Sequence, residues 1–460
     1  MMITLRPYQQ KMVEQIQHGM KRHKWQLLQL ATGGGKTFTA GDMINKARLK
    51  GTSCTFLVPR RELLKQTAES FTSVGIPFGY IAAGHAPNPR HLVQLATVGS
   101  LGNRMDKLTP PKLLFIDETH YGSGQLDKII QWAKDAGSWG IGLSGTPSRT
   151  DGKGLGMWYD NMIEGPSVSE LMDMGNLNRY TAYAPSTPDL SNIRTVAGDY
   201  AKGELADRME GDRVLVGSSV KHYKNLAMGN LAIAFCVSVK HAKIVAQSFR
   251  DEGIPSGTIH GGMSDAERKS VIMAFARREI KVLTSCQMLT FGFDLSSAAQ
   301  MSVTVECLID LQPTQSLAMQ LQKYGRGLRP WERPTVFLDH AGNLERHGFP
   351  DDPREWTLSD REKGNGGNAE PTMPTKQCGT CYFVHRPAPI CPNCGTEYPI
   401  ADRTIEEIEG ELEEVKRQEK KQERINQGRA QTLADLLIIE KEKGHKRGWA
   451  QHVYKARKRK

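Results

Sequence analysis

The stretch ATGGGKT, placed between a predicted strand and a predicted helix, constrains the fold of this chain more than any other. The apolar residues 25–30 predict the strand, and residues 38–49 predict the helix. Glycines let backbone N–H groups turn toward a polyphosphate, and a helix N-terminus directs its positive end at the same anion. Lys36 adds a positive charge, and the Thr37 hydroxyl adds a ligand for Mg²⁺. The stretch therefore predicts a cradle for a nucleoside triphosphate rather than a flexible turn.

Two further strand ends in the first half carry polar side chains. The apolar run 54–58 predicts a strand closed by Pro59, Arg60 and Arg61, and the segment 95–101, LATVGSL, ends another strand in small hydroxyl residues. Arg, Thr and Ser side chains at strand ends suit contacts with a nucleic acid backbone, although ordinary strand-to-helix loops share this composition.

The sequence DETH follows an apolar strand predicted over 113–116. Carboxylates at the end of a parallel strand lie beside the phosphate loop, so Asp117 is predicted to hold Mg²⁺ through its waters and Glu118 to polarise the attacking water. The next predicted strand runs into the small residues SGTP. Alternating strands and helices with phosphate chemistry at the strand ends predict a doubly wound parallel sheet that ends near residue 165.

A second α/β pattern begins at residue 231. It includes strands predicted over 281–284 and 303–308 and ends in QLQKYGRGLRP, where Arg326 and Arg329 are three residues apart. That spacing predicts that both side chains lie on one side of a helix. Two permanently charged guanidinium groups match the developing charge of a polyphosphate, although surface arginines without such a role are common.

The eight cysteines form two groups. Four lie in or beside apolar segments, where buried free thiols are expected: Cys54, Cys236, Cys286 and Cys307. Four have the spacing C-x₂-C-x₉-C-x₂-C, which predicts a closed, structural Zn²⁺ site, with disulfides as the alternative: Cys378, Cys381, Cys391 and Cys394. His385 and Arg386, between the two pairs, permit a nucleic acid contact.

The chain is predicted to work in a reducing, cytoplasmic-type compartment of a bacterial or phage-infected cell, without a membrane contact. The N-terminal sequence MMITLRPYQQK lacks the order of a signal peptide, and no run approaches the ~18 apolar residues of a membrane span. The net charge of +11 is concentrated in residues 441–460, which contain nine Lys or Arg and one Glu. Trp449 and Tyr454 alternate with these cations, which is typical of strand-stacking segments and equally of solubilising tails.

Two segments flank the cysteine site: a predicted linker precedes it, and a predicted helix follows it. Residues 361–374 are polar and rich in Gly and Asn, which is typical of a linker. After the cysteines, apolar residues recur at helical spacing over less than two heptads, which predicts a docking helix rather than a coiled coil: Ile405, Ile408, Leu412 and Val415.

Ten motifs in this order resemble those of the superfamily 2 helicases of the DExH kind, in the DEAD/DEAH box group. They are LRPYQ, ATGGGKT, FLVPRREL, TVGSL, DETH and LSGTP, followed by AFCVSVKHA, IHGGMS, TFGFDL and QKYGRGLR. Together they cover the chain from Leu5 to Asp339. The stretches TPSRTDGKGLG, GPSVSELMDMGNL and GWAQHVYK, with the four-cysteine site, look most like the RadD-type bacterial and phage helicases.

The resemblance implies two RecA-like domains with ATP and Mg²⁺ in the cleft between them. The implied ATP contacts, in which Gln9 and Arg6 read adenine, are Arg6, Gln9, Thr32, Gly33, Gly34, Gly35, Lys36, Thr37, Gly292, Asp294, Arg326 and Arg329. The implied catalytic residues are Lys36, Asp117, Glu118 and the arginine fingers Arg326 and Arg329, and the implied Mg²⁺ contacts are Thr37 and Asp117. The implied coupling residues are His120, Ser144, Thr146 and Gln322, with Gly145 where the family has alanine.

The predicted fold is α/β, with two RecA-like parallel-sheet domains, a zinc ribbon and a helical basic tail. The predicted domains are 1–165, which binds ATP; 166–355, with a linker at 166–219; the zinc ribbon 372–402; and 403–460.

The predicted function is that of an ATP-dependent DNA helicase or translocase in recombination, repair or replication. Its predicted partners are single-stranded or branched DNA and a protein such as a single-strand binding protein. An RNA helicase, a nucleic acid-binding module with little ATPase activity and the motor of a restriction system are the alternatives. No nuclease constellation of carboxylates and lysine supports the last of these.

Overall fold

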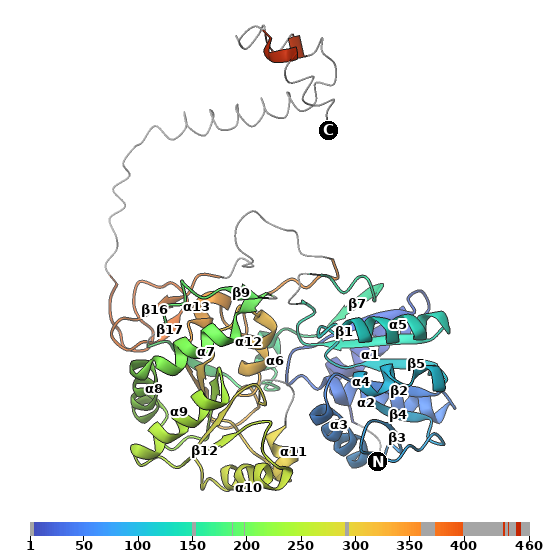
Figure 1. The fold of residues 1–460 in the computed structure, drawn as a ribbon, viewed down its shortest axis with the longest axis horizontal. Coiled ribbons are helices and arrows are strands. Elements are labelled where there is room, and N and C mark those ends of the chain that lie inside the picture. The colour runs from blue at the N-terminus through green and yellow to red at the C-terminus, as the bar shows by residue number, and fades with distance from the viewer. Residues whose placement is uncertain are drawn as a thin grey trace. The chain divides into compact units, whose positions relative to one another are not determined.

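The computed structural model describes residues 4–149, 153–185, 187–196, 198–289, 294–359 and 373–398, together with 436–437, 440 and 448–451. The compact unit Met1–Tyr398 contains two large parallel β-sheets, each flanked by helices (Figure 1). This finding confirms the predicted α/β fold with two parallel-sheet domains in tandem. In the described part of the chain, no helix is both long and apolar enough to cross a bilayer.

The first sheet has seven parallel strands in the order β3-β4-β2-β5-β6-β1-β7. The strands are β1 (Trp25–Gln29), β2 (Cys54–Val58), β3 (Gly79–Ile81), β4 (Val93–Thr97), β5 (Leu113–Ile116), β6 (Trp139–Ser144) and β7 (Asn161–Glu164). The helices are α1 (Pro7–Gly19), α2 (Lys36–Leu49), α3 (Arg61–Ser73), α4 (Val98–Gly102), α5 (Gly124–Asp135) and the 3₁₀ turn η1 (Met105–Lys107). Because β5, β6 and β1 are neighbours, the loops that follow them meet at one edge of the sheet.

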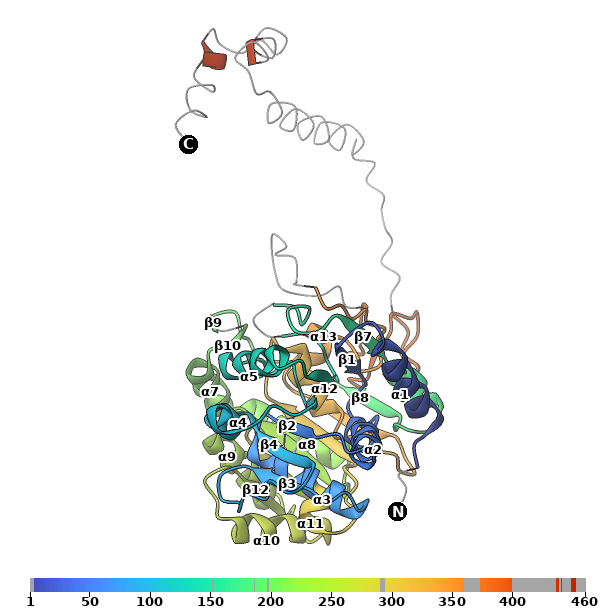
Figure 2. The ribbon, with the colours of Figure 1, turned by 90° about the vertical axis from the view of Figure 1, so that its right-hand side faces the viewer.

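The central strands of this sheet are buried on both faces. In β1, Leu27 packs in one cluster with Ile130 of α5, and the next residue, Leu28, packs in another with Ile44 of α2. Successive side chains of a strand point to opposite faces, so a continuous apolar strand needs helices on both sides. Helices α1, α2 and α3 cover one face, and α4 and α5 cover the other (Figure 2).

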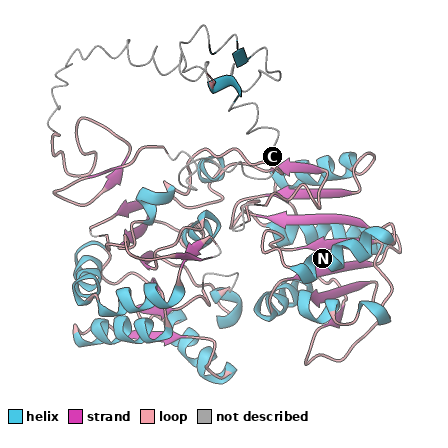
Figure 3. Cartoon of the chain, turned by 45° about the horizontal axis from the view of Figure 1, so that its top comes forward, coloured by secondary structure: helices cyan, strands magenta, loops and turns pink. Residues whose placement is uncertain are grey.

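The second sheet has six parallel strands in the order β12-β13-β11-β14-β15-β8. The strands are β8 (Tyr180–Tyr183), β11 (Ala232–Cys236), β12 (Ser256–Ile259), β13 (Val282–Ser285), β14 (Cys307–Leu311) and β15 (Thr335–Asp339). The helices are α6 (Val168–Asp173), α7 (Lys202–Gly211), α8 (Arg213–Leu226), α9 (Val239–Asp251), α10 (Asp265–Ala276), α11 (Leu295–Ala299), α12 (Leu317–Tyr324) and α13 (Asn343–His347). Figure 3 shows the strands of the two sheets as separate magenta stacks between cyan helices.

Two predictions about this half need correction or completion. The strand predicted over 303–308 is misplaced, because β14 begins only at Cys307. The N–H of Val303 donates to Ser296 Oγ at 3.0 Å and is therefore not available to a strand ladder. The segment predicted as the linker 166–219 contains α6, β8, the two-stranded ribbon β9 (Thr195–Val196) and β10 (Asp199–Tyr200), α7 and part of α8.

After α13 the chain returns from the second sheet to the first. We call residues 348–358 the strap. The guanidinium group of Arg354 shapes it by donating to four backbone carbonyls at 2.8–3.3 Å. At its far end, Leu358 packs with the first-domain cluster of Trp158, and its carbonyl accepts the N–H of Gly156 at 2.8 Å. The two domains are therefore connected twice.

Several predictions lie outside the described residues. They concern Gly292, the linker residues 361–372, the tail residue Tyr454, and the helix of Ile405, Ile408, Leu412 and Val415. Within the second unit, Pro399–Lys460, the described N–H of Ala450 donates to Glu440 at 2.7 Å.

Candidate functional site

Two left-handed backbone conformations shape the glycine loop between β1 and α2. Gly33 has a φ of +88° and Gly35 a φ of +90°, which L side chains rarely adopt. A Cβ atom at Gly33 would lie 2.8 Å from Leu177, and one at Gly35 would lie 2.4 Å from Gln9 Nε2. Glycine is therefore needed at both positions. Helix α2 begins at Lys36, so its first N–H groups face the loop.

Gln9 is bound to the glycine loop. Its Nε2 donates to the Gly34 carbonyl at 3.1 Å, and its Oε1 accepts the N–H of Arg6 at 2.9 Å. The hydroxyl of Tyr8 donates to the same carbonyl at 2.8 Å and accepts from Arg6 Nη1 at 3.2 Å. The structure thus brings Gln9 and Arg6 to the loop. The sequence reasoning missed Tyr8, whose only signal is its place in LRPYQ.

Asp117 and Glu118 follow β5 on the same edge of the sheet. Lys36 Nζ lies 3.9 Å from Glu118 Oε1 and donates to the Leu30 carbonyl at 3.3 Å. Glu118 has a φ of +46°, which is uncommon for a residue with a side chain, and its N–H donates to Asp117 Oδ1 at 3.0 Å. Burial, reinforced by the Glu118 carboxylate, raises the pKa of Asp117 to about 7. Thr37 lies half-buried at the start of α2. A divalent cation is favoured beside such paired acids.

His120, Ser144 and Thr146 lie next to these acids. His120 Nδ1 is 2.9 Å from Ser144 Oγ, which accepts the N–H of Thr146 at 3.1 Å. Burial lowers the pKa of His120 to about 4, so its imidazole is neutral at physiological pH. A Cβ atom at Gly145 would lie only 3.2 Å from Lys36 Nζ. Glycine therefore gives Lys36 more room than an alanine at this position would.

Arg326 and Arg329 do not lie on a helix, so that prediction is wrong. Helix α12 ends at Tyr324, and the chain continues as a tight turn. In this turn the N–H of Arg326 donates to the Lys323 carbonyl at 3.1 Å, and that of Gly327 donates to the Tyr324 carbonyl at 3.0 Å. The two glycines of the sequence YGRGLR account for the early end, because glycine is a poor helix former.

The two arginines have different surroundings. Burial and the neighbouring Arg329 lower the pKa of Arg326 to about 10, whereas Asp294 and Glu118 act in the opposite direction. The guanidinium of Arg326 is thus within electrostatic reach of Glu118 on the opposite wall. Arg329 is instead bound by Asp294, with N–O distances of 3.2 and 2.7 Å, and its side chain is 41% exposed. Asp294, which was expected to face ATP, holds Arg329 and caps α11.

The two domains touch around the glycine loop. A Cβ atom at Gly325 would lie 2.6 Å from Thr32 Cγ2, and the Tyr121 hydroxyl donates to Gln322 Oε1 of α12 at 2.6 Å. A pocket of about 220 Å³ between the domains is lined by Thr32, Gly325 and Arg354 of the strap, among others. Tyr121 was not predicted, and its only sequence signal is its position directly after DETH.

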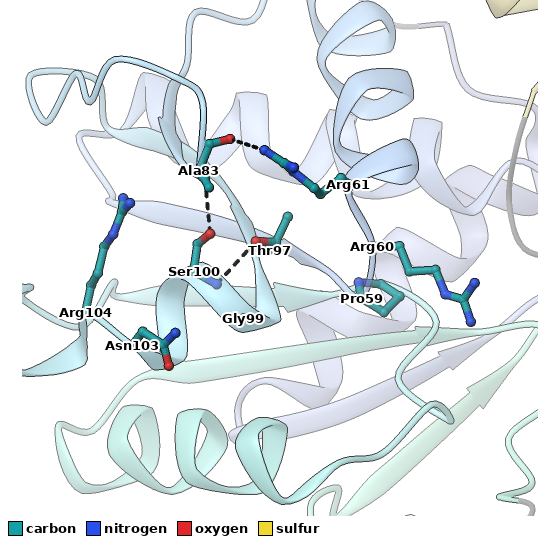
Figure 4. A pocket seen from close by; sticks show the side chains of 9 residues that line it. All are labelled: Pro59, Arg60, Arg61, Ala83, Thr97, Gly99, Ser100, Asn103 and Arg104. Carbon is teal, nitrogen blue, oxygen red and sulfur yellow. Dashed lines mark hydrogen bonds between the residues drawn. The ribbon is translucent and has the colours of Figure 1, made fainter. Parts of the chain in front are cut away.

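A second hollow, which we call the groove, lies on the first domain where β2 and β4 end. It has a volume of about 570 Å³ and is lined by Pro59, Arg60, Arg61, Ala83, Thr97, Gly99, Ser100, Asn103 and Arg104 (Figure 4). Arg61 Nη2 donates to the Ala83 carbonyl at 2.8 Å, and the Ala83 N–H donates to Ser100 Oγ at 3.2 Å. Arg60 and Arg104 lie at opposite ends of the groove (Figure 4). Cations and hydroxyls in this arrangement suit backbone phosphates.

The four C-terminal cysteines lie together, with all sulfur atoms within 4.8 Å of one another. Two of the Sγ–Sγ distances are 3.6 Å, between Cys378 and Cys394, and 3.7 Å, between Cys381 and Cys391. Tetrahedral thiolates at the usual Zn–S distance of ~2.3 Å are separated by ~3.8 Å, and a disulfide bond is ~2.05 Å long. A hydrogen bond from the Cys381 N–H lowers the pKa of Cys378 to about 5, which favours the thiolate that a metal binds.

The cysteine cluster is attached to the edge of the second sheet. Its short strands are β16 (Lys376–Gln377) and β17 (Val384–His385), and Phe383 forms a β-bridge with Tyr183 of β8. Arg386 pairs with Asp352 of the strap and lies 4.7 Å from the ring of Phe349. His385 Nε2 is 2.7 Å from the Tyr398 hydroxyl. His385 and Arg386, whose place between the two cysteine pairs permits a nucleic acid contact, are both engaged within the chain.

Two family models match the two halves. Residues 2–149 match the model described as the res subunit of type III restriction enzymes, and residues 218–330 match the helicase conserved C-terminal domain. A 51.5 kDa protein of a Lactococcus phage is 29% identical over 403 residues, which are 86% of this chain and 83% of that protein.

Two further likenesses cover only part of the other protein. A Schizosaccharomyces pombe protein named as a mitochondrial ATP-dependent helicase is 29% identical over 391 residues, and the match covers 79% of this chain but 61% of that protein. The structure of a fragment described as an HsdR subunit of a type I restriction enzyme from Vibrio vulnificus superposes with a TM-score of 0.56 at 21% identity. It covers 75% of this chain and 65% of the fragment, and the likeness concerns the fold alone.

Proposed function

Because the chain belongs to the superfamily 2 helicases, we propose that it is an ATP-dependent DNA helicase or translocase, which couples hydrolysis to movement along DNA or to its unwinding. The observation that carries the proposal is that Lys36 lies 3.9 Å from Glu118 beside the glycine loop, while the close approach of Gly325 to Thr32 brings the turn of Arg326 from the second domain to the same place. ATP bound there joins the domains, and phosphate release lets them part. Each cycle then advances a strand that lies across both domains.

The chemistry is divided between the two walls of the cleft. On the first wall, the N–H groups of residues 33–37 cradle the phosphates, Lys36 neutralises them, and Glu118 orients the attacking water. On the second wall, Arg326 supplies a charged fork for the transferred phosphoryl group, and Arg329 joins it on leaving Asp294. The remaining proposed roles are adenine reading by Gln9 and Arg6, and coupling to the strand by His120, Ser144, Thr146 and Gln322.

Mg²⁺ fits the acidic side of the cleft. Asp117 and Thr37 would hold it, because Asp117 is buried beside a second carboxylate and has a pKa raised to about 7. Bound there, Mg²⁺ supplies charge neutralisation at the phosphates. Asp117 then keeps its carboxylate ionised, and Glu118 remains available to the attacking water.

The groove supports nucleic acid as the substrate, and the likeness to RadD-type helicases favours DNA over RNA. The S. pombe relative is named as an ATP-dependent helicase, but this chain spans only 61% of its length. The boundaries of the predicted domains, a single-strand binding protein as partner, a cytoplasmic location and a role in recombination, repair or replication stay predictions.

Steady-state ATPase measurements test the proposed function. The protein is assayed alone and with single-stranded DNA, forked DNA and RNA of equal length. We expect DNA to stimulate hydrolysis more than RNA does. Stronger stimulation by RNA would reassign the substrate but keep the motor, and no hydrolysis under any condition would contradict the proposal.

Arg60→Ala and Arg104→Ala are each expected to weaken binding of single-stranded DNA and to reduce the slope of log Kd against log salt concentration by about 0.7. The reason is that each variant removes one cation from an end of the groove. Fluorescence anisotropy over a salt series measures both quantities. Arg22→Ala, an exposed arginine of the same domain that does not line the groove, is the control. Unchanged slopes for both groove variants would show that phosphates bind elsewhere.

We further propose that the four-cysteine cluster holds one structural Zn²⁺. The spacing of the four sulfur atoms supports this assignment. Zn²⁺ held by the four cysteines would link the two CxxC turns. The segment between these turns contains Phe383, which bridges to Tyr183 of β8, and Arg386, which pairs with Asp352 of the strap.

Cys391→Ser is expected to lose the metal and to lower the melting temperature of the protein, because three ligands no longer close the site. Elemental analysis measures the zinc content, and chelation of the unaltered protein should give the same shift in melting temperature. Cys286→Ser, which changes a half-buried cysteine outside the cluster, should keep the metal. If the cluster instead contains two disulfides, the protein would bind no zinc, and its mass would be lower than that of the fully reduced protein by four hydrogen atoms.

A further inference from the structure

Tyr121 has no role in the proposed chemistry, yet it joins the two domains. Its hydroxyl donates to Gln322 Oε1 of α12 at 2.6 Å, across the cleft. Gln322 lies near the end of α12, and the turn that follows this helix carries Arg326. The hydrogen bond therefore forms only when the segment that presents Arg326 is docked against the first domain.

Within its own domain, Tyr121 shares a turn with Glu118. The N–H of Tyr121 donates to the Glu118 carbonyl at 3.0 Å, and its ring lies 4.3 Å from that of His120. Glu118 holds a left-handed backbone conformation, with a φ of +46°. A displacement of Tyr121 is thus transmitted directly to the peptide that carries Glu118, because a single turn joins the two residues.

Tyr121 also lies within electrostatic reach of the groove. Burial and the Glu118 carboxylate raise the pKa of Tyr121, while the hydrogen bond to Gln322 and the charges of Arg60 and Arg326 act in the opposite direction. The hydroxyl is therefore a permanent donor at physiological pH. Arg60 stands at one end of the groove (Figure 4), so the Tyr121 hydroxyl that bonds Gln322 of α12 also interacts electrostatically with a groove cation.

We propose that Tyr121 is a positioning residue that makes closure of the cleft depend on nucleic acid in the groove. Phosphates bound in the groove attract Arg60. The turn that contains Tyr121 then adopts the conformation in which the Tyr121 hydroxyl donates to Gln322. That bond holds α12, and with it Arg326, opposite Glu118. The inference rests on the nucleic acid-dependent ATPase proposed above, and it adds the path by which the groove controls the cleft.

Tyr121→Phe tests this inference, because it removes one oxygen atom and keeps the ring beside His120. We expect basal ATP hydrolysis to change by less than about twofold and the maximal stimulation by single-stranded DNA to fall about tenfold, with little change in the Kd for DNA. The effect should appear in kcat rather than in KM for ATP. Tyr80→Phe removes a hydroxyl from the same domain, where the Tyr80 ring contacts Phe78 and His85, and is the matched control.

A double-mutant cycle separates coupling from structure. Gln322→Ala should reduce DNA stimulation as Tyr121→Phe does, and the double variant should be no worse than either single one. Hydrogen exchange adds a readout that does not depend on turnover, since DNA with a non-hydrolysable ATP analogue should protect α12 in the unaltered protein and not in Tyr121→Phe.

Three results would overturn the inference. They are full DNA stimulation of Tyr121→Phe, an equal loss of basal and stimulated rates, and weakened DNA binding that accounts for the whole loss. The response of the unaltered protein to nucleic acid shows whether the role of Tyr121 alone is wrong or the proposed function as well. If nucleic acid does not stimulate it, both are wrong; if it is stimulated and Tyr121→Phe matches it, only the role of Tyr121 is wrong.

Discussion

Lys36→Ala is expected to lower ATP hydrolysis by about 10²- to 10³-fold, because it removes a positive charge that faces the phosphates in the transition state. Lys36 Nζ donates to the Leu30 carbonyl and lies 3.9 Å from Glu118 Oε1. Without it, Asp117 and Glu118 face the phosphates with no cation from the loop. Nucleic acid binding should persist, since the groove lies at the ends of β2 and β4. Single-turnover hydrolysis and DNA anisotropy measure the two properties.

Lys46→Ala is the matched control for this variant. Lys46 lies on the same helix α2, is 54% exposed and pairs with Asp42 at 2.7 Å. It should hydrolyse ATP as the unaltered protein does. If Lys36→Ala fails to fold in a thermal melt, Lys36 is a structural residue; if it folds and hydrolyses ATP normally, the assignment of the glycine loop is wrong.

Arg326→Ala is expected to lower kcat by at least about 10³-fold with a much smaller effect on ATP binding, as for other arginine fingers. The charge of its side chain interacts with those of Asp294 in the second domain and Glu118 in the first. Its charge is thus held where the transferred phosphoryl group develops charge. Rapid-quench kinetics and equilibrium binding of a nucleotide analogue separate the two effects.

Arg329→Ala should have a smaller effect than Arg326→Ala, because Asp294 already binds its guanidinium group. Arg326→Lys should remain slow, since an ammonium group cannot replace the planar fork. Arg333→Ala, an exposed arginine of the same segment, is the control. The reverse order, with Arg329→Ala the more damaging, would mean that Arg329 rather than Arg326 is the principal finger.

The sequence predicted those parts of the fold and site that local pattern determines. A short apolar strand followed by glycines or acids places a loop at the carboxyl edge of a parallel sheet, so the positions of residues 33–37 and of Asp117 could be predicted. The three-residue spacing of Arg326 and Arg329 led to a wrong prediction. Residues three apart lie on one side of a helix only where the helix includes both of them. Here it ends at Tyr324.

The other misses depend on partners far away in the chain. Tyr121 bonds a residue 201 positions later, and Asp294 is occupied by a residue 35 positions later. Neither partner leaves a local signal. Helices α7 and α8 were missed for the same reason, because the strands that bury Met209 and Tyr223 lie later in the chain.

The strap has a consequence for synthesis of the chain on the ribosome. Leu358 completes the first-domain cluster of Leu155 and Trp158, and its carbonyl approaches so closely that a Cβ atom at Gly154 would lie 2.2 Å from it. The first domain therefore emerges roughly 200 residues before its last packing partner, a delay of about 10–40 s at usual elongation rates. Until then the part of this cluster that Leu358 packs against stays uncovered, and a chaperone that binds nascent apolar segments has that interval in which to act.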